Sequence, residues 1–377
     1  MLQTHSELHT HLMGMLSLDG ILEILREFKY PGFPVDSDGN LVFKENAEFT
    51  RTKKLTDEIV RGLIIPYGES IKYAEMETLY SNRAKLLADI AHYFAKSDTH
   101  ETQLLNRLYS RFLNLALEEL VSEENKVSYV EISFSNQDKI AYMLKHIPEG
   151  LKEKIDVKFL LCTNRTKSVK SLEKDLSKIR NAIATDQAIG FDFMGKEEPF
   201  NNNENDSKKK DSNSMNSFKT KLEAIISVLK DYPKSTLRIH TGENEESRCN
   251  PLSTLRMLDK VATQYGIQIP PPEIRLGHAI YFEDCDEYVN LLKKYQCIIE
   301  INASSNFALS NISHPNQLSY NYYLDRGIPV VISTDGAGIY DTHMTQENYI
   351  AHSVADDDGY LKILDIDKNI RKKKGSR

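Results

Sequence analysis

Four short polar segments, each at the end of an apolar run typical of a β-strand, bring together side chains that bind metals. They contain three histidines and one aspartate able to hold a divalent ion, with a glutamate and a further histidine left for proton transfer. A metal held by three or four protein ligands beside acid and base groups activates water. The segments are His9-Thr10-His11, His240-Thr241-Gly242-Glu243, Gly277-His278 and Ser333-Thr334-Asp335. The chain is therefore predicted to be a hydrolytic enzyme.

The expected metal ligands are His9, His11, His240 and Asp335. Residues two apart in a strand point the same way, so His9 and His11 project into one space. Taken singly, the histidines could be ordinary strand side chains and the aspartate a helix N-cap. Their joint occurrence at strand ends favours a metal site, and imidazole with carboxylate suits zinc.

The proton-transfer groups are Glu243 and His278. Glu243 follows His240 across a glycine that lets the chain turn closely, and His278 follows Gly277. Glu243 could instead begin a solvated acidic run, and His278 could be a buried histidine bonded to backbone. Beside a metal we expect a general acid and a general base.

Eight short β-branched runs alternate with segments of helical periodicity. In order, the strand candidates are Glu7–His9, Val127–Phe134, Val157–Cys162, Ile189–Phe193, Thr236–His240, Ile274–Gly277, Cys297–Ile301 and Val330–Ser333. Apolar stripes at helical spacing, such as the one from Phe218 to Leu229, lie between them. This alternation predicts an α/β fold, a (β/α)₈ TIM-type barrel, whose active site lies at the carboxyl ends of the strands.

Two segments interrupt this pattern within what we expect to be a single domain over residues 1–377. Residues from about 30 to 99 are too many for one connection, and their periodicity predicts extra helices after the first strand. Asn201–Ser217 contains one apolar residue, Met215, and is expected to be a mobile low-complexity loop.

Composition limits the partners and the compartment. The 377 residues carry a net charge of −7, so no binding of duplex nucleic acid or anionic membrane is expected. No apolar run has membrane-spanning length, and no secretory signal is visible. The four cysteines show no paired spacing, as in a reducing compartment. We expect a cytoplasmic protein.

The ordered motifs resemble the adenosine deaminase family of metal-dependent hydrolases. They run from the first strand to the eighth and cover nearly the whole chain. The matching segments are Glu7–Gly14, Tyr129–Glu131, Gly190–Gly195, His240–Glu243, Arg275–His278, Ser304–Asn306 and Ser333–Asp335. The resemblance implies a barrel that holds one zinc ion per chain and deaminates the C6 position of a purine.

The resemblance also implies roles for single residues. His9, His11, His240 and Asp335 match the metal ligands, and Asp335 also belongs to the catalytic set. Glu243 matches the acid that protonates purine N1, and His278 matches the base that acts on the attacking water. Gly195 matches the glycine that meets the purine edge, and His11 adjoins the substrate. Asp192 and Glu300 are either partners of the metal ligands or structural carboxylates.

Met13 departs from the family pattern, which has an acidic residue there for the ribose 5′-hydroxyl. Methionine cannot accept that bond usefully, and its neutrality removes repulsion of a 5′-phosphate. Substrates such as AMP or dAMP, as in the AMP and N6-methyl-AMP deaminase relatives, are therefore favoured over nucleosides, unless Met13 only packs. Candidate phosphate partners are Arg51, Lys53, Lys54 and Lys196.

Gly336 is a more serious departure from the family pattern, because the family has a second aspartate at this position, and that aspartate contacts N7 of the purine. Another group such as Asp341, or a partner chain in a homo-oligomer, would have to replace that contact. Altered purine contacts also occur in deaminases of bacterial antiphage systems. The protein could therefore have a partner from such a defence system. Alternatives are a different metal-dependent amidohydrolase, with Lys196 bridging two metals, or a catalytically weak barrel that senses nucleotides.

Overall fold

The computed structural model describes residues 4–30, 32–34, 41, 52–53, 56–66, 68–200, 215–266 and 273–374. In this part of the chain eight parallel strands form one sheet in the order β1-β4-β5-β6-β7-β8-β9-β10. They are β1 (His5–His11), β4 (Val127–Phe134), β5 (Asp156–Asn164), β6 (Gly190–Met194), β7 (Thr236–Thr241), β8 (Glu273–His278), β9 (Ile298–Ile301) and β10 (Val330–Ile332).

The sheet closes where its first strand meets the segment after its last. Thr10 and Asp335 form a parallel β-bridge. The backbone N–H of Asp335 donates to the carbonyl of His9 (2.8 Å), and the N–H of His11 donates to the carbonyl of Asp335 (3.1 Å). Closure makes the sheet a barrel, so the predicted (β/α)₈ architecture is confirmed.

All eight predicted strand runs overlap a strand of the barrel. The differences lie at the ends: β1 extends over His5–His11 and β5 over Asp156–Asn164, both longer than predicted. The strands are almost wholly buried, because helices cover their outer faces and charged side chains such as Glu131 and Arg238 fill the inside of the barrel.

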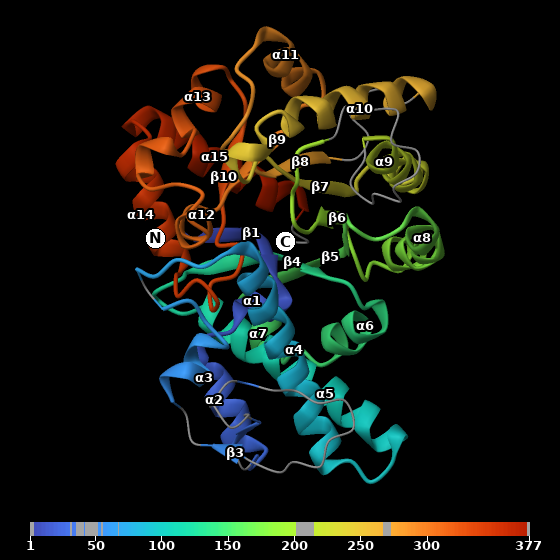
Figure 1. Ribbon diagram of the computed structural model, residues 1–377, viewed down its shortest axis with the longest axis vertical. Coiled ribbons are helices and arrows are strands. Elements are labelled where there is room, and N and C mark those ends of the chain that lie inside the picture. The colour runs from blue at the N-terminus through green and yellow to red at the C-terminus, as the bar shows by residue number, and fades with distance from the viewer. Residues whose placement is uncertain are drawn as a thin grey trace.

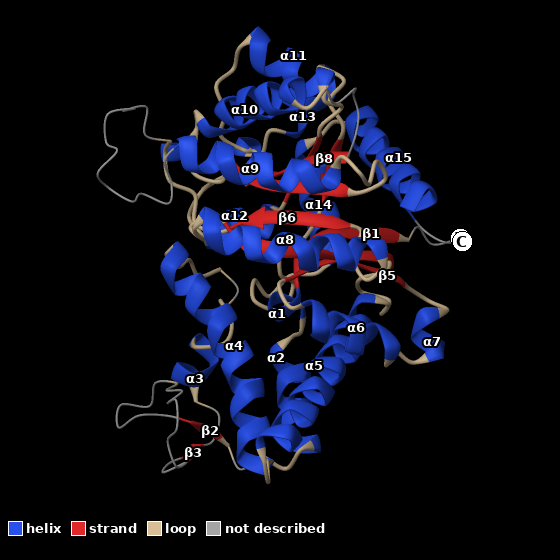
Figure 2. Ribbon diagram, turned by 90° about the vertical axis from the view of Figure 1, so that its right-hand side faces the viewer, coloured by secondary structure: helices blue, strands red, loops and turns tan. Residues whose placement is uncertain are grey.

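Helices lie between successive strands and surround the barrel (Figures 1 and 2). They are α6 (Gln137–Lys145), α7 (Glu149–Lys152), α8 (Val169–Ala184), α9 (Met215–Leu229), α10 (Asn250–Gln264), α11 (Asp286–Lys294), α12 (Ala303–Ala308), α13 (Tyr320–Asp325), α14 (Met344–Val354) and α15 (Asp357–Lys374), with 3₁₀ turns η1 (Glu245–Ser247) and η2 (Pro315–Gln317). The apolar stripe of α9 is buried as its periodicity predicted. Among the described helices, none combines the length and hydrophobicity needed to cross a membrane.

The segment between β1 and β4 contains the extra helices that the sequence predicted. These are α1 (Leu12–Met15), α2 (Leu18–Glu27), α3 (Asp57–Arg61), α4 (Tyr73–Phe94) and α5 (Asp98–Leu120), with a small antiparallel pair, β2 (Phe33–Pro34) and β3 (Thr52–Lys53). The Ser17 hydroxyl caps α2 by accepting from the N–H of Gly20. Helices α4 and α5 project from one side of the barrel (Figures 1 and 2), and α4 covers one wall of the cavity described below.

The predicted loop Asn201–Ser217 lies largely outside the described residues, which exclude 201–214. Its last three positions are helical, because α9 begins at Met215. The boundary of the expected loop was therefore placed too far along the chain at this end.

Candidate metal centre and active site

Five side chains, four of them buried and His11 nearly so, converge from four separate parts of the barrel at the carboxyl ends of its strands. His9 and His11 come from β1, His240 from β7, His278 from the end of β8, and Asp335 from the turn after β10. Ligand atoms of His9, His11 and His240 all lie within 4.8 Å of one another, as do those of His9, His278 and Asp335. Chain segments more than 300 residues apart thus form one cluster.

The cluster contains nitrogen atoms that have no hydrogen-bond partner in the described structure. They are Nε2 of His9, Nε2 of His240 and Nδ1 of His278. Buried polar atoms are normally satisfied, so such a concentration of unsatisfied atoms indicates a missing ligand. One carboxylate oxygen, Oδ1 of Asp335, lies 3.6 Å from His9 Nε2 and 3.4 Å from His11 Nε2.

The protonation states suit a metal. Burial lowers the pKa of His9 well below its ordinary value, and burial lowers the pKa of His11 to about 4. Both imidazoles are therefore neutral near pH 7, the form that binds metals. Imidazole nitrogens together with the carboxylate of Asp335 fit the ligand preferences of zinc.

Two of the clustered residues have strained backbones. His278 and Asp335 each have a φ of 66°, in the left-handed region that disfavours residues with a Cβ. Such conformations cost on the order of 1–3 kcal/mol each and persist where the surrounding structure enforces them, often at functional sites. Both lie where a strand ends, which places their side chains over the barrel mouth.

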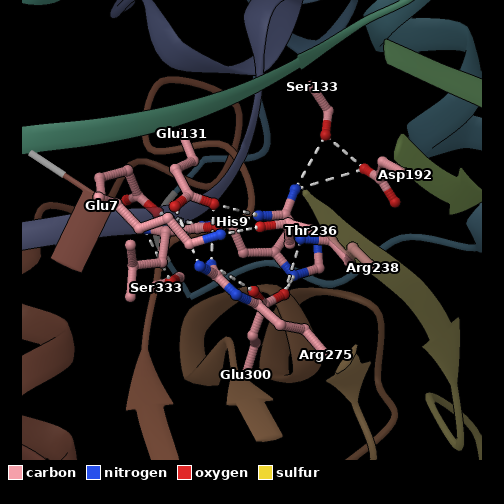
Figure 3. Close-up of polar contacts among 12 residues, drawn as sticks. Glu7, His9, Glu131, Ser133, Asp192, Thr236, Arg238, Arg275, Glu300 and Ser333 are labelled. Carbon is pink, nitrogen blue, oxygen red and sulfur yellow. Dashed lines mark hydrogen bonds and ion pairs between the residues drawn. The ribbon is translucent and has the colours of Figure 1, made fainter. Parts of the chain in front are cut away.

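Beneath the cluster, buried charges fill the barrel interior (Figure 3). His9 Nδ1 lies 2.9 Å from Oε2 of Glu300, which leaves His9 Nε2 facing the cluster. Glu300 also accepts from Arg238 (2.7 Å) and Arg275 (3.2 Å), and Arg275 pairs with Glu131 (2.8 Å). These arginines compensate carboxylates that would otherwise be costly to bury.

Asp192 and Glu300 both contact the histidine cluster and the arginines. Oδ1 of Asp192 lies 3.3 Å from Nε2 of His240, and its Oδ2 lies 3.4 Å from Arg238. Glu300 therefore both orients a histidine and belongs to the buried charge network, whereas Asp192 belongs to that network and contacts His240 at Nε2, one of the cluster nitrogens.

Asp335 has two partners for its second oxygen that the sequence did not identify. Ser305 and Tyr340 donate hydrogen bonds to Oδ2 at 2.7 and 3.1 Å. These bonds leave Oδ1 directed at His9 and His11. Ser305 falls in a segment that carried the family resemblance, whereas no local pattern indicated Tyr340.

Glu243 is held over the cluster as a protonated acid. Gly242 (φ 67°) provides the turn, and a Cβ there would lie 2.3 Å from the carbonyl oxygen of Tyr281. Oε1 of Glu243 lies 3.9 Å from Nε2 of His278. Burial, together with the charges of Asp335 and Glu197, raises the pKa of Glu243 to about 8. At neutral pH Glu243 can therefore donate a proton.

Glu197 supports Glu243 from behind. Its Oε2 accepts the backbone N–H of Glu243 (3.0 Å), and its Oε1 accepts from Thr241 and Asn250 (3.0 Å each). The side chain is buried. Sequence reasoning missed this residue, although it follows Gly195 by only two positions.

A cavity of about 430 Å³ lies over the cluster. His11, His240, Glu243, His278 and Asp335 line it, and so do the predicted substrate residues Met13 and Gly195. Gly195 (φ 107°) has no room for a side chain, because a Cβ would lie 2.4 Å from Asn164 Oδ1. The cavity has the size and mostly apolar wall of a small-molecule site.

Gly336 does not contribute to the described wall of this cavity, whereas Tyr80 of α4 does. Asp341, the suggested replacement for a second aspartate, is exposed and also absent from that wall. The hydroxyl of Tyr80 instead donates to the carbonyl of Asp335 (3.4 Å).

The suggested phosphate partners are not in the described cavity wall. Lys196 is 54 % exposed and pairs with Glu198 at 3.3 Å. Arg51, Lys54 and the side chain of Lys53 lie outside the described residues. The cavity wall contains another lysine, Lys139 of α6, which the sequence did not single out.

No protein-family model matches the chain. Over 73 residues it is 32 % identical to an adenosine deaminase from Enterococcus faecalis, covering 19 % of this chain and 22 % of that protein. The chain thus matches about a fifth of the length of the curated relatives. This local similarity agrees with the family resemblance of the motifs.

Solved structures share the fold over almost the whole chain. The N6-methyl-AMP deaminase from Arabidopsis thaliana superposes with a TM-score of 0.62 at 18 % identity, covering 100 % of this chain and 93 % of that one. An Arabidopsis ADAL structure complexed with IMP gives a TM-score of 0.60 at 18 % identity, covering 98 % and 97 %. The barrel with its extra helices is therefore the fold of these deaminases.

Proposed function

We propose that this protein is a zinc-dependent deaminase that hydrolyses the C6 amino group of an adenine nucleoside or nucleotide, giving the inosine form and ammonia. The observation that carries the proposal is that Glu243 and His278, 3.9 Å apart, line the same cavity as the metal-binding side chains of His11, His240 and Asp335. A binding site without catalysis has no need of both groups.

Each residue of the site has its own role in this reaction. His9, His11, His240 and Asp335 would hold one zinc ion, which supplies Lewis-acid activation of water. His278 accepts a proton from the attacking water, and Glu243 donates a proton to the purine ring nitrogen beside the carbon under attack. Gly195, which has no side chain, allows the purine edge to approach the backbone closely. The left-handed backbone conformation at His278 and Asp335 directs both side chains into the cavity.

Two alternatives have weaker support. A two-metal amidohydrolase would need Lys196 as a bridge, but this lysine is half exposed and paired with Glu198. A nucleotide sensor would not require the acid–base pair over the cluster. We also infer a cytoplasmic location from the four cysteines, all of which are free. An antiphage role or a homo-oligomer stays a prediction from the sequence.

The test is a product assay on metal-analysed protein. Zinc-loaded chain would be incubated with AMP, dAMP, ATP, dATP, adenosine and deoxyadenosine, and ammonia release would be followed. We expect about one zinc per chain and turnover of at least one substrate. Folded protein with one zinc bound that releases ammonia from none of them would overturn the proposal, and two metals per chain would favour the amidohydrolase.

A further inference from the structure

The cavity has a reactive region and a second region that contains neither Glu243 nor His278. The reactive region is lined by Gly195, Glu243, His278 and Asp335, which lie at or just after the ends of β6, β7, β8 and β10. The second region is formed on the other side of β1 by Met13, Ala84 of α4, Tyr109 of α5 and the segment after β4. The pairing of His11 with Ser133 places the end of β4 directly beside the cluster. A purine in the reactive region would leave the second region for its sugar and any phosphate.

Lys139 is the only lysine or arginine in the described wall of the cavity. It lies in the first turn of α6, where its backbone N–H donates to Oδ1 of Asn136, the N-cap residue. Its ammonium lies 4.6 Å from the centroid of the Tyr109 ring. Within the described part of the chain, this ammonium makes no ion pair with a carboxylate.

This position is unfavourable for an unpaired cation on two counts. Cations are destabilised at helix N-termini, where the helix dipole is positive. Burial also lowers the pKa of Lys139, and the neighbouring Asp138 only partly opposes that effect. The contact with Tyr109 compensates in part, since cation–π contacts contribute modestly. An anion in the cavity would relieve both penalties.

The carboxylates that line the cavity do not come from this region. Glu243 and Asp335 lie over the metal cluster, and Glu77 lies in the first turns of α4, about two helical turns before Ala84. Near Lys139 the wall instead contains Met13, Phe134 and the polar residues Ser135 and Asn136. The second region therefore combines one positive charge with neutral hydrogen-bonding groups.

We propose that Lys139 binds the 5′-phosphate of an adenine nucleotide, so that the substrate of this site is a nucleotide and not a free nucleoside. This inference rests on the proposed function, because it uses the position of the purine to place the phosphate. Lysine binds phosphate as a compact charge without the bidentate geometry of arginine.

The experiment compares kcat/KM for AMP and for adenosine in the zinc-loaded chain. Lys139→Met is expected to lower kcat/KM for AMP by about 10- to 100-fold, the effect of one charged hydrogen bond, and to change the value for adenosine less than about twofold. Lys139→Arg should retain most of the preference for AMP. Lys145→Met removes the same charge from the exposed end of α6 and should change neither value.

A binding measurement separates failure of this inference from failure of the proposed function. Calorimetry with IMP and with inosine should show tighter binding of IMP to the wild type and a loss of that difference in Lys139→Met. Equal turnover of AMP and adenosine by the wild type, or an equal loss for both in Lys139→Met, would overturn the inference. If no substrate is turned over, wild-type protein that binds IMP no more tightly than inosine overturns it as well.

Discussion

The hydroxyl group of Tyr80 occupies the space that a side chain at position 336 would need. A Cβ built on Gly336 would lie 2.6 Å from Tyr80 Oη and 3.2 Å from the Cα of Gly14. The same hydroxyl donates to the carbonyl of Asp335, and the Tyr80 ring meets His11 edge to face. Gly336 and Tyr80 therefore depend on each other, because the Tyr80 side chain from α4 fills the space beside Asp335 that a side chain at position 336 would need.

Gly336→Ala is expected to destabilise the fold by about 1–3 kcal/mol, the usual cost of overpacking. Tyr80→Phe removes the nearest atom, so the double variant should be more stable than the two separate effects predict. Urea unfolding of the four proteins in a double-mutant cycle measures this coupling. Gly150→Ala, where a Cβ meets nothing within 4 Å, is the matched control. Additivity within about 0.5 kcal/mol would show that the two residues do not interact.

Glu243→Gln is expected to retain zinc and to lose turnover by about 10²- to 10⁴-fold, because the amide cannot act as a general acid. Steady-state kinetics with metal analysis of the same sample makes the measurement. Glu245→Gln, an exposed carboxylate of the same loop, should keep wild-type activity. If Glu243→Gln remains active, another group must protonate the substrate.

The activity should fall at high pH as Glu243 loses its proton. The acid form exists below its pKa, which burial raises to about 8, so kcat/KM should be level below that pH and decline above it. A bound divalent cation lowers the pKa of Glu243 and so moves the decline in kcat/KM to lower pH. Glu197→Gln removes a negative charge that raises the pKa of Glu243, so in this variant the decline should begin at a still lower pH. Glu198→Gln, on the exposed side of the same turn, should leave the profile unchanged. An unshifted decline in Glu197→Gln would contradict this account.

Glu300→Gln is expected to weaken zinc binding by about 10- to 100-fold, as is usual when the partner of a metal-bound histidine is changed. The carboxylate lies 2.9 Å from His9 Nδ1 and fixes the orientation of that ring. Competition with a chromogenic chelator measures the affinity. Glu273→Gln provides the comparison, because Glu273 also pairs with Arg275 (2.6 Å) but, within the described part of the chain, forms no ion pair with a histidine of the cluster. Equal zinc affinity in both variants would show that Glu300 serves only the arginines.

The strands and the clustered residues could be predicted because their signals are local. Buried parallel strands read as continuous β-branched runs, and a barrel brings the ends of such runs together. His240 and His278 could therefore be placed in one site from their strand ends alone. Arg238 lies two residues before His240 on the same face of β7, and Arg275 is its partner in the neighbouring strand, so these arginines could also have indicated the charged barrel interior.

The cavity wall could not be predicted in the same way. Tyr80 of α4 contacts Asp335, which lies 255 positions further along the chain, and Lys139 of α6 contacts Tyr109 of α5. Such contacts depend on how α4 and α5 pack against the barrel, which helical periodicity does not determine. Lys196 is one of four candidate phosphate partners in the sequence, but its side chain is half exposed and pairs with Glu198.

The seam between β1 and Asp335 makes the order of biosynthesis matter for this protein. The strand that carries His9 and His11 is made more than 300 residues before residue 335, which supplies both its sheet neighbour on one side and its carboxylate partner. The growing chain must therefore keep β1 available until residue 335 has been synthesised. A product truncated before residue 335 could neither close the barrel nor bring the four predicted metal ligands together.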